Sequence, residues 1–250
     1  MPKVITVTNQ KGGVGKTALA VHIAAYAAMA MKKKTLLVDM DGQRNATFVL
    51  TGESGDHEHP VVDLWDDDAV LSFKATRFGR LQVLPGDRDI VQAGDQGLKA
   101  GIAAMSRLLD TDFEIIVVDT PPAAGVQQVA PLYLGGLLVA PVEPDLLAMQ
   151  GLTSLLKVWR KISGEVDLDL ALVFNKRVLN SVNQQMVADS IVNSSFGKYA
   201  IPQVLTNRQI VSNAMKNGMP VWEFDKKDNA AAKWAGACAF LLSKLEGQHG

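Results

Sequence analysis

The sequence predicts an α/β fold in which a mostly parallel, twisted sheet is flanked by helices on both faces. Short apolar or β-branched runs alternate with helix-length segments along the 250 residues. Several of these runs end at an acidic residue or at a glycine-rich turn, which is typical of parallel strands whose carboxyl ends carry a ligand site. With 48% hydrophobic residues the chain can bury a large core. We therefore expect one domain over residues 1–250.

The periodicity places the elements in chain order. The first expected strand alternates and is β-branched, and the later ones are short apolar runs followed by an acid, a proline or a glycine. The expected strands are Lys3–Thr8, Thr35–Asp39, Leu81–Leu84, Phe113–Val118, Leu137–Val142, Leu170–Phe174 and Val221–Phe224. The expected helices are Ala18–Met31 and the segments near 90–109, 126–133, 147–162, 180–195, 207–217 and 228–245. Residues 52–60 are rich in acids and histidines, and we expect an exposed loop there rather than a metal site.

Charge and cysteine content exclude several classes of protein. The 25 basic and 26 acidic residues nearly cancel, so overall charge does not indicate a nucleic-acid or lipid binder. Residues 1–150 contain 13 basic and 18 acidic side chains, and residues 151–250 contain 12 and 8, so any basic surface is expected in the second portion. The one cysteine, Cys238, excludes an intramolecular disulfide and is expected in the core. The amino terminus has no signal-like leader, so a cytoplasmic location is expected.

A glycine-rich segment between the first strand and the first helix predicts a phosphate site. Glycines let the backbone curl around phosphates, and the amides of the loop and of the helix start donate to phosphate oxygens. Lys16 would add a positive charge, and the Thr17 hydroxyl suits Mg²⁺. The residues expected to bind the nucleotide here are Gly12, Gly13, Val14, Gly15, Lys16 and Thr17.

Together with Lys11, residues 11–17 (Lys-Gly-Gly-Val-Gly-Lys-Thr) resemble the deviant Walker A signature of the ParA/MinD family of P-loop ATPases. The resemblance implies that Lys11 reaches the nucleotide of the opposite subunit, so that a homodimer forms face to face around two ATP molecules. A second ammonium near the triphosphate would neutralise charge that develops during phosphoryl transfer. The alternative for Lys11 is a solvated loop cation.

Two further segments resemble family motifs. Residues 36–47 resemble the strand and switch motif Asp-x-Asp-Pro-Gln-Gly-Asn, which implies that Asp41 orients the attacking water while Asp39 assists Mg²⁺ or fixes the loop. Gly42 and Arg44 depart from that motif, where the family has proline and glycine. Residues 113–122 resemble the Walker B strand, which implies that Asp119 holds Mg²⁺. The alternative for Asp119 is a cap on the next turn.

The second half of the chain carries weaker signals. Asn175 resembles an asparagine that helps hold adenine, although an ordinary strand-end residue is the alternative. Residues 139–145 resemble a strand and turn near the dimer face, and residues 207–223 resemble the end of plasmid-type ParA proteins. This resemblance implies ATP-dependent binding of nonspecific double-stranded DNA and a ParB-like adaptor that stimulates hydrolysis. The cations expected to face DNA phosphates, each alternatively a solvated side chain, are Arg208, Lys216, Lys226, Lys227 and Lys233.

Two alternatives to a partition ATPase stay open. A membrane-associated, MinD-like regulator needs a basic amphipathic end, whereas residues 240–250 hold one lysine and an acid, so no membrane partner is expected. A metabolic ATP-dependent synthetase of the same superfamily is disfavoured by Lys11. Because so little chain precedes Lys3, no helix-turn-helix extension and no operator recognition are expected. The leading hypothesis is a cytoplasmic protein that is nucleoid-associated when ATP-bound.

Overall fold

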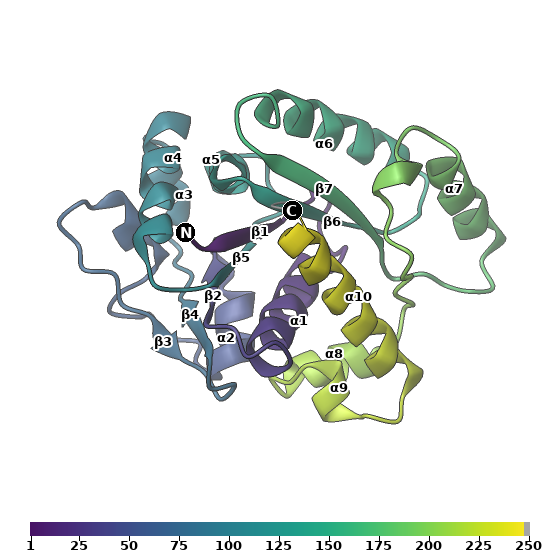
Figure 1. Ribbon diagram of the computed structural model, residues 1–250, viewed down its shortest axis with the longest axis horizontal. Helices are drawn as coiled ribbons and strands as arrows, with labels where there is room; N and C mark the ends of the chain where they lie inside the picture. The colour runs from purple at the N-terminus through teal and green to yellow at the C-terminus, as the bar shows by residue number, and fades with distance from the viewer. Residues whose placement is uncertain (248–250) are drawn as a thin grey trace.

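The computed structural model describes residues 1–247. Within these residues the strands form one seven-stranded sheet in the order β3-β4-β2-β5-β1-β6-β7 (Figure 1). Only β3 runs antiparallel to its neighbour β4, and the other pairs are parallel. The strands are β1 Lys3–Val7, β2 Thr35–Asp39, β3 Lys74–Ala75, β4 Leu81–Leu84, β5 Ile115–Asp119, β6 Gly136–Val142 and β7 Leu168–Phe174. The α/β fold expected from the sequence is confirmed.

Helices cover both faces of this sheet. Figure 1 shows α1, α2, α8, α9 and α10 on one face, and α3 to α6 on the other. The helices are α1 Lys16–Met29, α2 Asn45–Thr51, α3 Ile90–Gly94, α4 Leu98–Ser106, α5 Val126–Val129, α6 Ala148–Ile162, α7 Val182–Val192, α8 Gln209–Lys216, α9 Val221–Phe224 and α10 Asn229–Glu246. Short 3₁₀ turns lie at Val61–Trp65, Arg107–Asp110, Ala130–Leu134 and Gly197–Tyr199. Within residues 1–247 no helix is long and apolar enough to cross a membrane.

The central strands are buried on both faces, which explains their nearly continuous apolar sequences. In β1, Ile5 and Val7 pack into the core under α1 and α10, whereas Val4 packs into the core on the opposite face. Cys238 of α10 is fully buried in the first of these cores, as expected. This two-sided burial makes β1 and its neighbours a rigid base for the loops at their carboxyl ends.

The structure corrects the expected strand at Val221–Phe224, which is the short helix α9. Pro220 precedes it with φ −67°, and the Glu223 amide donates to the Pro220 carbonyl, so the chain turns instead of extending. A four-residue apolar run does not distinguish a buried turn from a strand by its period.

Other element boundaries also differ from the sequence expectation. The helix expected near 90–109 is divided, because Gly97 adopts φ +89° between α3 and α4. The helix α2 and the two-residue edge strand β3 were not expected from the pattern, since both are too short to show a clear period. Of the terminal segment 240–250, for which no membrane anchor is expected, residues 248–250 lie outside the described part of the chain.

His22 ties α1 to the segment that the sequence misassigned. Its Nε2 atom accepts a hydrogen bond from the Val221 amide at 3.0 Å, and its Nδ1 atom lies 2.6 Å from the Ala18 carbonyl oxygen. The imidazole also packs between the rings of Trp222 and Trp234. Burial lowers the pKa of His22 to about 4, so the folded protein holds this ring neutral.

The free energy of unfolding is expected to fall on acidification because of His22. The unfolded chain binds a proton at the ordinary pKa of 6.5, whereas the folded chain resists it down to about pH 4. The contribution of His22 is therefore complete above pH 6.5 and is lost as the pH falls toward 4, by about 3 kcal/mol in total. Urea unfolding at a series of pH values measures this loss.

The control is His22→Gln, whose amide oxygen can still accept from Val221 but does not titrate in this range. Asp39 and Asp119 have raised pKa values, so they make the free energy of unfolding change with pH in the opposite direction. Because both carboxylates are present in the wild type and in His22→Gln, the difference between the two proteins reports His22. An identical pH dependence in the wild type and in His22→Gln would contradict the prediction.

Candidate phosphate-binding site

The glycine-rich loop leaves the carboxyl end of the central strand β1 and ends where α1 begins at Lys16. Gly13 and Gly15 adopt φ values of +75° and +95°, which only glycine takes without strain. A Cβ atom on Gly15 would also overlap the Nδ2 atom of Asn175. The first N–H groups of α1 have no intrahelical partner, so the loop and helix together form a site suited to phosphate.

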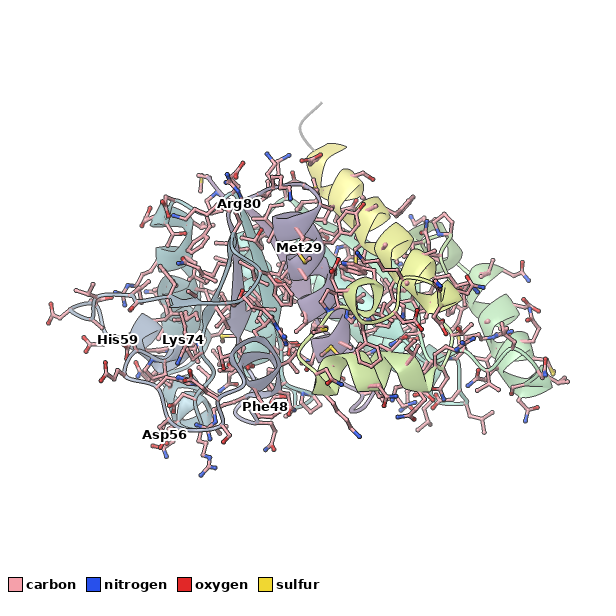
Figure 2. The ribbon with its side chains drawn as sticks, turned by 90° about the horizontal axis from the view of Figure 1, so that it is seen from below. Met29, Phe48, Asp56, His59, Lys74 and Arg80 are labelled. Carbon is pink, nitrogen blue, oxygen red and sulfur yellow. The ribbon has the colours of Figure 1, made fainter. Side chains whose placement is uncertain are left out.

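Figure 2 shows on which edge of the molecule this site lies. Met29, at the end of α1, lies in the same half of the view as Arg80, whereas Phe48 and Asp56 lie in the opposite half. Because α1 runs from Lys16 to Met29, the phosphate loop lies on the edge of Phe48. The carboxyl ends of the parallel strands point the same way.

Two asparagines hold the loop in place. Asn175, at the end of β7, is 4% exposed, and its Nδ2 atom donates to the Val14 carbonyl at 2.8 Å. Asn9 accepts from the Lys11 amide at 2.9 Å and donates to the Pro141 carbonyl at 2.8 Å. Asn175 thus braces the loop, and its contact with adenine stays a prediction. The sequence interpretation missed Asn9, although an asparagine directly after a strand is typical of such turns.

The two lysines of the loop have different surroundings. Lys16 is 6% exposed, and its Nζ atom donates to the Lys11 carbonyl at 3.1 Å. Burial lowers the pKa of Lys16, and the charges of Asp119 and Asp41 oppose that shift. Lys11 instead forms ion pairs with Asp145 and, at 3.7 Å, with Glu143. Its ammonium is therefore held by the turn after β6, while Lys16 faces the buried carboxylates.

Asp39 and Asp119 are the two fully buried carboxylates at the sheet edge. They end the adjacent strands β2 and β5 and are direct partners in the parallel register. Burial raises the pKa of Asp119 well above its usual range, and the charge of Asp39 adds to the rise, whereas Thr17 and Lys16 oppose it. Within the described residues neither oxygen of Asp119 makes a hydrogen bond of ordinary geometry, although the Thr17 hydroxyl lies close enough to lower the pKa of Asp119. A buried, unpartnered carboxylate beside Lys16 fits a site for a divalent cation.

Asp39, in contrast, is bound by the protein itself. Its Oδ2 atom accepts from the amide and the hydroxyl of Thr47 at 2.8 and 2.7 Å, and its Oδ1 atom accepts from the Asp41 amide at 3.2 Å. Burial raises the pKa of Asp39 to about 6, and these hydrogen bonds oppose the rise. This arrangement favours the role of fixing the switch loop over the role of Mg²⁺ ligand. The sequence interpretation missed Thr47, which also accepts from the Gly86 amide at 2.9 Å.

The two departures from the family motif have different structural consequences. A Cβ atom on Gly42 would lie 3.5 Å from the Asp87 carbonyl, an ordinary contact, so this glycine is not required by space. Arg44 adopts φ +59° directly before α2. Its guanidinium donates to the Ser54 carbonyl at 3.1 Å and to the Asp56 carboxylate at 2.7 Å. Arg44 therefore ties the switch segment to the loop of residues 52–60.

A pocket of about 260 Å³ opens beside the phosphate loop. Its wall combines the start of α1 with the end of β7 and with helix α8. Gly15 and Ala18 are nearest to the phosphate loop, and Trp234 provides an aromatic wall from α10. A mostly apolar pocket next to a phosphate cradle fits the base of a nucleotide.

The cations expected to contact DNA lie directly before α8, on α8, on α10 and on the connection between α9 and α10. Lys216, Lys226 and Lys227 are exposed, whereas Lys233 is half-buried on α10. Arg208 forms an ion pair with Asp228 at 2.7 Å, so part of its charge is neutralised. The structure thus brings these residues to neighbouring elements on one side of the sheet (Figure 1).

The parallel sheet, the glycine loop between β1 and α1, and the buried Lys16 and Asp119 define a P-loop nucleotide-binding protein. Residues 2–172 match the family model AAA_31, described as an AAA domain. The chain is 30% identical to the sporulation initiation inhibitor protein Soj of Bacillus subtilis over 92% of its own length and 94% of that protein. The chain therefore belongs to the ParA/MinD family of P-loop ATPases.

Two solved structures of different proteins have a fold similar to that of this chain. The ATP complex of a McdA variant from Cyanothece has a TM-score of 0.85 at 17% identity and covers 97% of this chain and 96% of that one. Cobyrinic acid a,c-diamide synthase from Mycobacterium smegmatis, with a bound ATP analogue and magnesium, has a TM-score of 0.79 at 21% identity, and the match covers 99% of this chain and 97% of that one. At these identities the likeness shows the fold alone.

Proposed function

We propose that this protein is an ATP-dependent partition ATPase. In its ATP-bound dimeric state it would bind nonspecific double-stranded DNA and position a plasmid, a chromosome region or other cargo. A ParB-like adaptor would stimulate hydrolysis and release. The observation that carries the proposal is the placement of Lys11, which is held by the turn after β6, whereas Lys16 is buried beside Asp119 and Asp41 of its own chain. Similarity to Soj over most of both chains supports the partition role.

The residues of the site fit ATP and Mg²⁺. The loop amides and the start of α1 would hold the phosphates, and Lys16 would neutralise their charge. Mg²⁺ would bind to the Thr17 hydroxyl and, directly or through water, to the unpartnered Asp119 carboxylate. The bound cation would neutralise the charge that Asp119 carries in its buried position.

Asp41 is the residue proposed to orient the attacking water. Its amide is fixed by Asp39, and its Oδ1 atom accepts from the Gln43 amide at 3.0 Å. Unlike the other two carboxylates of the site it is not fully buried, so it can contact solvent near the phosphate loop. A carboxylate placed in this way can accept a hydrogen bond from water and direct it toward phosphorus.

The surface around Lys11 supports a dimer. Leu146 and Leu147 follow Asp145, and they are 89% and 63% exposed. The connection after the adjacent strand β7 adds exposed Val178 and Leu179. Large apolar side chains grouped in this way are typical of a protein interface. A second subunit placed over this edge would cover them and bring its own Lys11 toward the nucleotide.

The described part of α10 gives no support to a membrane anchor. Leu241, Leu242 and Leu245 are all buried in the core, so the apolar face of this helix packs on its own domain. An interfacial helix needs that face free for lipid. The fold is shared with a biosynthetic enzyme, but the chain's relatives and the placement of Lys11 favour the partition role.

The test is DNA binding measured with ATP, with ADP and without nucleotide. We expect salt-sensitive binding to arbitrary duplex DNA that is at least about tenfold tighter with ATP than with ADP. Charge neutralisation at phosphates makes the affinity fall steeply with salt. Equal binding in all three conditions, or no binding to duplex DNA, would reject the partition function.

A further inference from the structure

Helix α2 is fastened to the nucleotide site at its amino end. The Arg44 amide donates to the Asp41 carbonyl at 2.8 Å immediately before α2 begins. Within the first turn of the helix, Thr47 holds the Asp39 carboxylate through two hydrogen bonds. The Asp41 segment and the start of α2 are therefore joined by direct hydrogen bonds.

The same helix contacts the turn that follows α8. Gly218, in that turn, has φ +61°, and a Cβ atom there would lie 2.5 Å from the carbonyl oxygen of Val49 in α2. The turn thus packs directly on the backbone of α2. Arg77, which follows the edge strand β3, donates from Nη2 to the Asn217 carbonyl at 2.5 Å and also to the Gly218 carbonyl.

Arg77 is one of the residues that line an open pocket. A pocket of about 430 Å³ lies between α2, the segment around β3 and the end of α8. Phe48 of α2 lines it and is 48% exposed, and Lys216 of α8 lines it from the other side. On one side of this space Gly218 packs on the carbonyl of Val49 in α2, and Arg77 holds the carbonyls of the turn that contains Gly218. Arg77 therefore keeps the turn after α8 in place against α2.

Helix α8 also reaches the base side of the nucleotide site. Val211, Ser212 and Met215 line the 260 Å³ pocket beside Gly15 and Ala18. The helix therefore lines the pocket near the base, and the turn that follows it packs on the switch helix α2 at Gly218, where Arg77 holds its carbonyls. It carries Lys216 at its last turn, one of the cations proposed to contact DNA.

We propose that Arg77 is the positioning residue that couples the nucleotide state to DNA binding. It would fix the end of α8, and with it Lys216, to the position of α2 that accompanies ATP binding at the Asp41 segment. This inference rests on the proposed function. Coupling of this kind requires that Arg77 hold the two helices differently in the ATP and ADP states.

The experiment compares Arg77→Met with Arg80→Met. Methionine is similar in length to the aliphatic part of arginine but lacks the N–H donors and the charge of the guanidinium group. Arg80 is exposed and lies on the edge of the molecule opposite Phe48 (Figure 2), so the control loses the same charge away from this contact. For each variant the Kd for duplex DNA is measured with ATP and with ADP, together with nucleotide affinity. Arg77→Lys serves as the conservative variant, since one ammonium can donate to both carbonyls.

We expect Arg77→Met to lower the ratio of the Kd in ADP to the Kd in ATP by at least about fivefold relative to Arg80→Met. Both nucleotides are expected to remain bound at saturating concentration, because Arg77 does not line the base pocket. Arg77→Lys should restore the ratio at least in part. An unchanged ratio in Arg77→Met would overturn the coupling role.

A second readout separates this inference from the proposed function. If wild-type protein shows no ATP-dependent DNA binding, the partition function fails, and hydrogen exchange of residues 209–218 tests the coupling by itself. We expect this segment to differ in exchange between the ATP and ADP states of the wild type, and to lose that difference in Arg77→Met. Equal nucleotide dependence in both proteins would overturn the coupling.

Discussion

Replacing Lys16 by alanine is expected to abolish ATP hydrolysis, with a loss of at least about 10³-fold in rate. Lys16 is buried at the start of α1, and within the described chain its ammonium donates to the Lys11 carbonyl and faces Asp119 and Asp41. Its removal would leave the phosphates without the one cation that their own chain places inside the site. Phosphate release under saturating ATP, together with binding of a fluorescent ATP analogue, measures both consequences.

Lys11→Ala is the matched variant, because it removes the same side chain from the same loop. Lys11 contacts Asp145 and Glu143 instead of the buried carboxylates, so this variant should still bind nucleotide as a monomer. It should lose the ATP-dependent dimer and hydrolysis. Dimerisation equal to that of the wild type, measured by light scattering with ATP, would contradict the role of Lys11 in the opposite subunit.

Asp41→Asn is expected to slow hydrolysis by about 10²–10⁴-fold while ATP binding and the ATP-dependent dimer persist. The amide keeps the shape of the side chain and can still accept from the Gln43 amide, but it is a poorer acceptor for a proton from water. Single-turnover hydrolysis and dimer lifetime with ATP measure the two effects. The variant should therefore accumulate in the DNA-binding state.

Asp87→Asn is the control for this substitution. Asp87 lies next to the switch segment, where its carbonyl faces Gly42, and its carboxylate accepts from the Asp89 amide at 2.7 Å. It has no part in the proposed chemistry, so its loss should leave hydrolysis within about twofold of the wild type. A similar loss of rate in both variants would show that charge near the loop, rather than the position of Asp41, governs hydrolysis.

Much of the fold was predictable because its central strands are buried on both faces. The runs Thr35–Asp39 and Leu81–Leu84 match the observed strands β2 and β4 in both bounds. Short elements at the rim were not predictable, since α2, β3 and α9 are stabilised by contacts distant in sequence. The Val221 amide, for example, has its partner in His22, 199 residues away.

The candidate site was also predictable only in part. The sequence indicated the glycine loop, both lysines and three carboxylates, because these residue types stand at the ends of buried strands. The structure distinguishes the carboxylates from one another: within residues 1–247 Asp119 makes no hydrogen bond of ordinary geometry, and Asp39 is satisfied by Thr47. Burial and hydrogen bonding set these roles, and neither can be assigned from residue type.

The sequence by itself determined the class of this protein, since the spacing of Lys11, Lys16 and Thr17 within a glycine-rich loop specifies a phosphate site wherever a strand and a helix flank it. Only the tertiary structure decided that Lys11 is held by Asp145, that Asn9 and Asn175 brace the loop, and that Arg77 holds the turn after α8. The physical reason is separation along the chain. These contacts join residues up to 161 positions apart, and they form only when the whole sheet brings its strand ends to one edge.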